Sequence, residues 1–282
     1  MGFWKSLFSG SEESPEEIAL HKKEAEFDIL RTDGQKASRV GQHDYAVRCF
    51  RKALEIKDDL EVRDYLAHAL IRNHELQDAI IELDILQDAE PDNIQIALLK
   101  AQVFYMLEDY DGMKACLESR GEDALVCYWL AKAYIGLEDN EKAIELLCKA
   151  VRAKEDFWDA YLLRCQTYLK MDKMNEAQKD SDHLLNMVGE QEETLLMKAR
   201  IEAKKGETEQ AMQDYNKVIE VNPFSVEGFR ERALLKKQQG DEDGYKEDME
   251  TSISINANGT DEDIEEKIKQ QYRNIDPYGI FG

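Results

Sequence analysis

Histidines, cysteines and carboxylates are the side chains of this chain that could carry chemistry, and none of them forms a catalytic pattern. The pair His68 and His74 has a six-residue spacing, whereas two metal ligands on one helix face need a spacing of four. The sequence contains no glycine-rich phosphate loop and no nucleophile elbow. We therefore expect no catalytic residue, no metal site and no cofactor, and an enzyme is the weakest of the function classes.

The composition of the chain limits the classes of partner it can bind and indicates the cellular compartment in which it works. Acidic residues number 60 against 37 basic ones, so the net charge is −23 at pH 7, and such a surface repels the phosphates of nucleic acid. Five cysteines without a Cys-x-x-Cys pair are typical of reduced thiols in a cytoplasmic protein. We find no run of eighteen apolar residues for a transmembrane helix and no secretory signal, so a cytoplasmic location is expected.

The elements that would position any site are helices. Apolar residues recur at helical spacing, as at Leu125, Trp129 and Ala133, and no long segment alternates with period two. Three segments, beginning at Gly41, Glu138 and Gly206, resemble one another, and their spacing fits a repeat of 34 residues. Seven repeats result, and they begin near Phe27, Leu60, Ile94, Ala124, Trp158, Glu192 and Val226.

Two positions of the repeat are nearly constant in size. Position 8 is small in all seven repeats: Gly34, Ala67, Ala101, Ala131, Cys165, Ala199 and Ala233. Position 20 is alanine except in the third and seventh repeats: Ala46, Ala79, Met113, Ala143, Ala177, Ala211 and Tyr245. Small side chains at both positions allow two helices of one repeat to cross closely. The third repeat is also short, because its second helix ends near Arg120.

These repeats resemble the tetratricopeptide repeat family over roughly nine-tenths of the chain. The resemblance implies an all-α, right-handed superhelical solenoid of about seven helix-turn-helix units with a C-terminal capping helix. The expected organisation is an apolar N-terminal segment at 1–13, a solenoid at 14–259, a capping helix at 260–275 and a tail at 276–282.

Helix ends can also be predicted. Ser14 and Glu17 have the spacing of a capping box, with Pro15 at the first helical position, which predicts a long helix that runs into the first repeat. Gly41, Gly206 and Gly240 are expected to close the first helix of their repeats in the left-handed conformation.

The resemblance also implies a function, which is a non-enzymatic scaffold or adaptor that binds a protein or peptide ligand in a concave groove. In the family, the groove is lined by positions 2 and 13 of the first helices and, between them, by positions 5, 9 and 12. Here they supply apolar side chains on either side of a stripe of Gln, Lys and Arg donors. The expected peptide-binding residues are Leu98, Gln102, Tyr105, Tyr128, Lys132, Ile135, Leu162, Gln166, Leu169, Leu196 and Arg200.

Several alternatives stay open beside this interpretation. Acids at position 2 and bases at position 13 are also explained by the helix dipole alone. Chaperone-tail binding is disfavoured, because the family's carboxylate-clamp positions carry other residues here. In the alternative function, the protein is a structural or assembly subunit of a complex and self-associates through its apolar ends, around Trp4 and Phe281. We expect the N-terminal segment to pack on protein, since anionic lipid would repel the acidic body and disfavour membrane contact.

Overall fold

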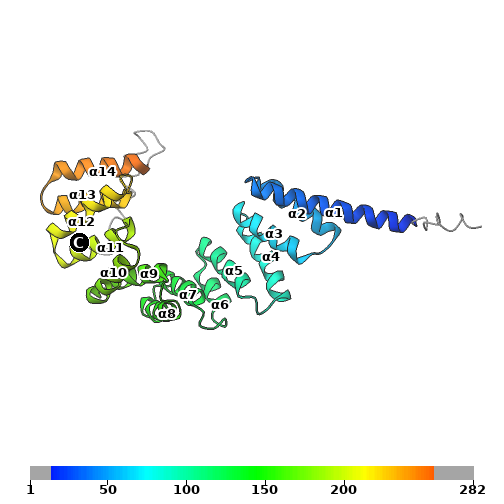
Figure 1. The fold of residues 1–282 in the computed structure, drawn as a ribbon, viewed down its shortest axis with the longest axis horizontal. Helices are drawn as coiled ribbons and strands as arrows, with labels where there is room; N and C mark the ends of the chain where they lie inside the picture. The colour runs from blue at the N-terminus through cyan, green and yellow to red at the C-terminus, as the bar shows by residue number, and fades with distance from the viewer. Residues whose placement is uncertain (1–13, 257–282) are drawn as a thin grey trace, which may run out of the picture. The chain divides into compact units, whose positions relative to one another are not determined.

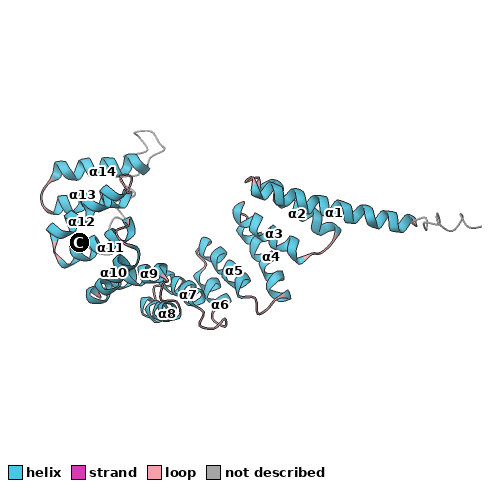
Figure 2. Cartoon of the chain, in the orientation of Figure 1, coloured by secondary structure: helices cyan, strands magenta, loops and turns pink. Residues whose placement is uncertain are grey.

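Residues 14–256 are described by a computed structural model, and every regular element in that range is an α-helix (Figures 1 and 2). The helices are α1 (Pro15–Arg39), α2 (His43–Ile56), α3 (Leu60–Arg72), α4 (Leu76–Ala89), α5 (Ile94–Met106), α6 (Tyr110–Leu117), α7 (Ala124–Gly136), α8 (Asn140–Ala153), α9 (Trp158–Lys170), α10 (Met174–Val188), α11 (Glu192–Lys205), α12 (Thr208–Val221), α13 (Val226–Gln238) and α14 (Glu242–Asn256). The predicted absence of strands is confirmed for the described residues.

The helices pair in chain order, and each odd-numbered helix packs on the even-numbered helix that follows it. From the second repeat onward, the first helix begins at the residue where the repeat is expected to begin. The chain divides into two compact units, residues 1–119 and 120–282. The first unit contains repeats one to three, and the second unit contains repeats four to seven. Helix α6, which ends the first unit, has only 8 residues.

Close helix crossings hold each repeat together. The alanines and the cysteine at position 8 are fully buried, and so are the five alanines and Met113 at position 20. At Gly34 the contact is tighter still, because a Cβ atom placed there would lie 2.5 Å from the Phe50 ring. Small side chains at these crossings let the two helices of a repeat approach within ordinary packing distance. Within each of the two units, a repeat then buries its remaining apolar face against the next.

Every repeat makes the same turn between its helices. Position 15 has a positive φ in all seven repeats, at Gly41, His74, Glu108, Glu138, Asp172, Gly206 and Gly240. The left-handed conformation predicted for the three glycines is confirmed. The other four residues adopt it as well, although a Cβ atom makes this conformation costly. The turn is therefore imposed by the repeat and not by glycine alone.

Both ends of the described range bear on the sequence predictions. The Ser14 hydroxyl accepts a hydrogen bond from the backbone N–H of Glu17, and the Glu17 carboxylate accepts one from the backbone N–H of Ser14. The predicted capping box and long first helix are therefore confirmed. The predicted N-terminal segment at 1–13, capping helix at 260–275 and tail at 276–282 lie outside the described residues. None of the described helices is both long enough and apolar enough to cross a membrane.

Candidate functional site

The first helices of the fifth, sixth and seventh repeats line a hollow of about 340 Å³ in the second unit, which we call the α9–α13 hollow. Helix α11 contacts α9 on one side and α13 on the other. Four of the predicted peptide-binding residues meet here, and they are Leu162 and Gln166 from α9 with Leu196 and Arg200 from α11. The structure thus collects side chains 38 positions apart in the sequence into one depression.

The predicted residues divide into buried, half-buried and exposed side chains, and the exposed ones are Gln102 and Tyr105. Leu98, Leu169, Leu196 and Arg200 are 4%, 0%, 6% and 7% exposed, so little of their surface is available to a ligand. The remaining residues of the second unit are half-buried: Tyr128, Lys132, Ile135, Leu162 and Gln166. Half-buried side chains of this kind have a fixed position and still present an accessible face.

Arg200 is held by a carboxylate of the next repeat. Its guanidinium donates from Nε and Nη2 to both oxygens of Glu231 at 2.7–3.1 Å, and Glu231 is 3% exposed. The Tyr215 hydroxyl donates to the same carboxylate at 3.2 Å. A two-pronged arginine–carboxylate pair fixes the planes of both groups. The guanidinium therefore connects α11 to α13 at the base of the hollow.

Tyr128 and Lys132 form a second cluster on α7. The Lys132 ammonium lies 4.5 Å from the Trp129 ring centre and 5.7 Å from that of Tyr128, within the range of cation–π attraction. Tyr128 also packs on Phe157, with 5.1 Å between ring centres. Burial lowers the pKa of Lys132 below its usual range, and Asp159 opposes this effect. The ammonium is thus already engaged with aromatic faces of its own unit.

The three predicted residues of the first unit lie on α5. Gln102 and Tyr105 are exposed, and Tyr105 packs edge-on against Tyr110, with 6.4 Å between ring centres. Leu98 is part of the interior. These three residues do not line the α9–α13 hollow.

The side chains considered for catalysis do not assemble in the part of the chain that the structure describes. All five cysteines are free thiols there, and burial raises the pKa of Cys165 to about 12, which leaves almost no reactive thiolate at neutral pH. Residues 14–256 contain no group of three or more potential metal ligands. His68 lies 3.7 Å from Asp64. This pair alone does not supply the nucleophile, base and orienting group that a catalytic site needs.

Sequence reasoning missed the acidic rim of the α9–α13 hollow. Glu193 from α11 and Glu227 from α13 line it, together with Glu192 and Met197. Glu193 and Glu227 stand at position 2 of their repeats, where the helix dipole was a sufficient explanation for an acid. Their shared repeat position was the one signal in the sequence, and only the stacking of α11 on α13 brings both to the same depression.

The fold belongs to the class of all-α helical-repeat proteins. Residues 124–157 and 192–225 match the tetratricopeptide repeat family model, and these ranges are the fourth and sixth repeats. No curated protein matches the chain. The fourth and sixth repeats are therefore tetratricopeptide repeats, and the other repeats of the described range share their paired helices and buried small positions.

Solved structures share the fold at low sequence identity. A tetratricopeptide repeat protein from Parabacteroides merdae has a TM-score of 0.72 at 17% identity, covering 87% of this chain and 98% of that one. MamA from Desulfovibrio magneticus, residues 41 to the end, has a TM-score of 0.53 at 22% identity, covering 57% and 94%. PilF of Pseudomonas aeruginosa has a TM-score of 0.56 at 17% identity, covering 73% and 96%.

Proposed function

We propose that this protein is a non-catalytic binding module that holds an extended segment of a protein partner on the first helices of its second unit. The observation that carries the proposal is the α9–α13 hollow, which combines a half-buried leucine, a half-buried amide and exposed carboxylates. Three apolar and five polar or charged side chains line the hollow, and binding sites commonly place polar groups that orient a ligand beside apolar surface.

The residues of the hollow have distinct roles in this proposal. Leu162 offers apolar surface for a side chain of the ligand, and Gln166 offers both a donor and an acceptor for its backbone. Glu193 and Glu227 are exposed at the rim and would select against acidic ligand residues. Arg200 acts from below, because its bond to Glu231 fixes the spacing of α11 and α13.

Site-specific photo-cross-linking tests the proposal. A photoreactive phenylalanine analogue replaces Gln166 in the hollow or, as the matched control, the exposed Glu176 on the second helix α10 of the same repeat. We expect the same partner band from native lysate with the Gln166 variant only, and its loss when Leu162→Glu is added. Cross-linking from the Glu176 position alone would place the binding face on the second helices and contradict the proposal.

The enzyme alternative has a separate test. A turnover screen on hydrolase and transferase substrates with the purified protein is expected to show no activity above buffer. Activity that survives purification to homogeneity and disappears on unfolding would overturn the non-catalytic part of the proposal.

A further inference from the structure

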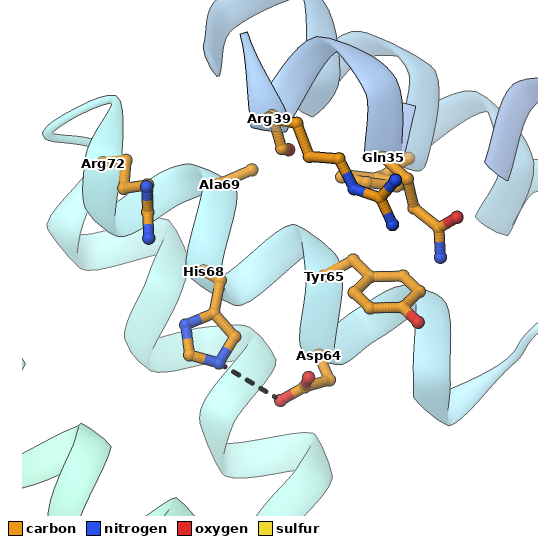
Figure 3. A pocket seen from close by; sticks show the side chains of 9 residues that line it. Gln35, Arg39, Asp64, Tyr65, His68, Ala69 and Arg72 are labelled. Carbon is orange, nitrogen blue, oxygen red and sulfur yellow. Dashed lines mark ion pairs between the residues drawn. The ribbon is translucent and has the colours of Figure 1, made fainter. Parts of the chain in front are cut away.

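A second hollow lies within the first unit, between α1 and α3, and has a volume of about 440 Å³; we call it the α1–α3 hollow. Figure 3 shows Gln35 and Arg39 from α1 opposite Tyr65 and His68 from α3, with Arg72 also from α3 at its edge. It is built entirely from the first two repeats and shares no residue with the α9–α13 hollow.

The two arginines of this hollow differ from the other arginines of their unit. Arg39 and Arg72 are exposed, and neither has an ion-pair partner among residues 14–256. The remaining arginines of the unit all pair with carboxylates: Arg31 with Asp28 and Glu61, Arg48 with Asp44, Arg51 with Glu75 and Asp78, and Arg63 with Asp58 and Glu82. In a chain with a net charge of −23, two guanidinium groups left open at one hollow are an exception.

The helix dipole accounts for the placement of these arginines but not for the composition of the hollow. Arg39 and Arg72 both stand in the last turn of their helices, where a cation is favoured. The dipole acts on the charge alone and leaves the donors of each guanidinium unpaired. Around them the hollow adds the Gln35 amide and the Ser38 hydroxyl, which are further donors, and the rings of Phe50 and Tyr65.

The local charge of the hollow is positive. Asp64 is the only carboxylate among the described residues that line it, and Asp64 faces His68 at 3.7 Å. Glu61 lies next to the hollow, where it accepts a hydrogen bond from the Tyr65 hydroxyl at 2.6 Å, and its charge is paired with Arg31 at 3.6 Å. The two arginines therefore outweigh the single acid that lines the hollow. At physiological ionic strength charges are screened over about 8 Å, so a short ligand responds to this local excess more than to the charge of the whole chain.

We propose that the α1–α3 hollow is a second binding site, which takes a short acidic segment of a protein partner. Carboxylates of the segment pair with Arg39 and Arg72, in the planar two-pronged geometry that arginine offers to carboxylates. An apolar side chain of the same segment packs on Tyr65. A long polyanion such as nucleic acid extends beyond the hollow into the acidic surface, which disfavours it. The site is independent of the proposed function of the second unit, and either can fail alone.

Fluorescence anisotropy of a labelled peptide tests this site. The probe is an eight-residue peptide of glutamates with one central leucine, and its matched control carries glutamine in place of every glutamate. We expect the full chain to bind the acidic probe and to bind the neutral probe at least about tenfold more weakly, a difference of 1.4 kcal/mol. Equal binding of the two peptides would overturn the assignment of an acidic ligand, and so would no binding of the acidic probe.

Two double variants locate the binding. Arg39→Gln with Arg72→Gln should weaken the acidic probe by about tenfold or more. Arg152→Gln with Lys179→Gln changes the net charge equally at exposed positions of the second unit and should leave binding within about twofold. Thermal unfolding of each variant checks that the fold is retained. Equal losses in both variants, or a loss in the control alone, would show general charge attraction and contradict a site in the α1–α3 hollow.

Discussion

Arg200 and Glu231 form a buried ion pair that joins the first helices of the sixth and seventh repeats, with 2.7 Å between Nη2 and Oε1. Tyr215 completes the cluster from α12. Arg200 occupies the repeat position at which the family presents ligand contacts. Here its guanidinium instead pairs with a carboxylate of the next repeat and so holds the two repeats together.

Replacing Arg200 with alanine should destabilise the protein by about 3 to 5 kcal/mol, because it leaves the Glu231 carboxylate buried without its cation. Urea unfolding followed by circular dichroism measures the loss. The matched control is Lys170→Ala, which removes an exposed cation from the end of α9 and should change stability by less than about 0.5 kcal/mol. A stable Arg200→Ala variant that no longer captures a partner would instead make Arg200 a direct ligand contact.

Glu202 should make stability depend on pH near neutrality. Burial, and then the neighbouring Asp214, raise the pKa of Glu202 from an ordinary value of 4.5 to about 7. The folded state therefore holds this proton more tightly than the unfolded state does. The stabilising contribution is complete below about pH 4.5 and is lost as the pH rises to about 7.

Glu202→Gln tests that dependence, because a neutral amide imitates the protonated acid. Relative to the unchanged chain, the variant should gain stability at pH 8 and show little difference at pH 5. Thermal unfolding at both pH values provides the comparison, with the exposed Glu220→Gln as the control. An equal effect of Glu202→Gln at pH 5 and pH 8 would show that the carboxyl does not titrate in this range.

The left-handed turn residues predict stabilising substitutions. Glu138 has φ 63° between α7 and α8, and a side chain in this conformation costs roughly 1 to 2 kcal/mol. Glu138→Gly should therefore raise the stability of the second unit by up to about 1 kcal/mol. The converse change, Gly206→Ala at φ 80°, should lower it by a similar amount. Melting temperatures that move the same way for both variants would contradict this account.

The contact of Gly34 with Phe50 predicts a coupled pair of substitutions. Gly34→Ala places a methyl group where the Phe50 ring lies at 2.5 Å, and overpacking of this kind costs about 1 to 3 kcal/mol. The better helix propensity of alanine offsets at most about 1 kcal/mol of that cost. In a Phe50→Leu background the penalty should shrink, which a double-mutant cycle of urea unfolding measures. Additive effects would mean that the helix relieves the clash elsewhere.

The repeat positions show how far local pattern reaches. Small residues at positions 8 and 20 predicted the helix pairs, because two crossing backbones leave no room for larger side chains in any repeat. The same reasoning found the left-handed glycines, including Gly206, but missed Glu138 and the other non-glycine residues at that position. Their side chains carry no signal for a positive φ, which the stacked helices impose on them.

The sequence by itself determined the all-α repeat architecture of this protein, the boundaries of its helix pairs and the helices that carry candidate ligand contacts. Those properties follow from periodicity, which acts over one or two turns of helix and is visible in residue order. Tertiary structure alone decided which of these side chains stay accessible at the surface. Arg200 is buried in an ion pair with Glu231, which lies 31 residues further along the chain. Arg39 and Arg72, by contrast, line the α1–α3 hollow from neighbouring first helices. Pairing and burial depend on the neighbours that stacking supplies, and no local spacing encodes them.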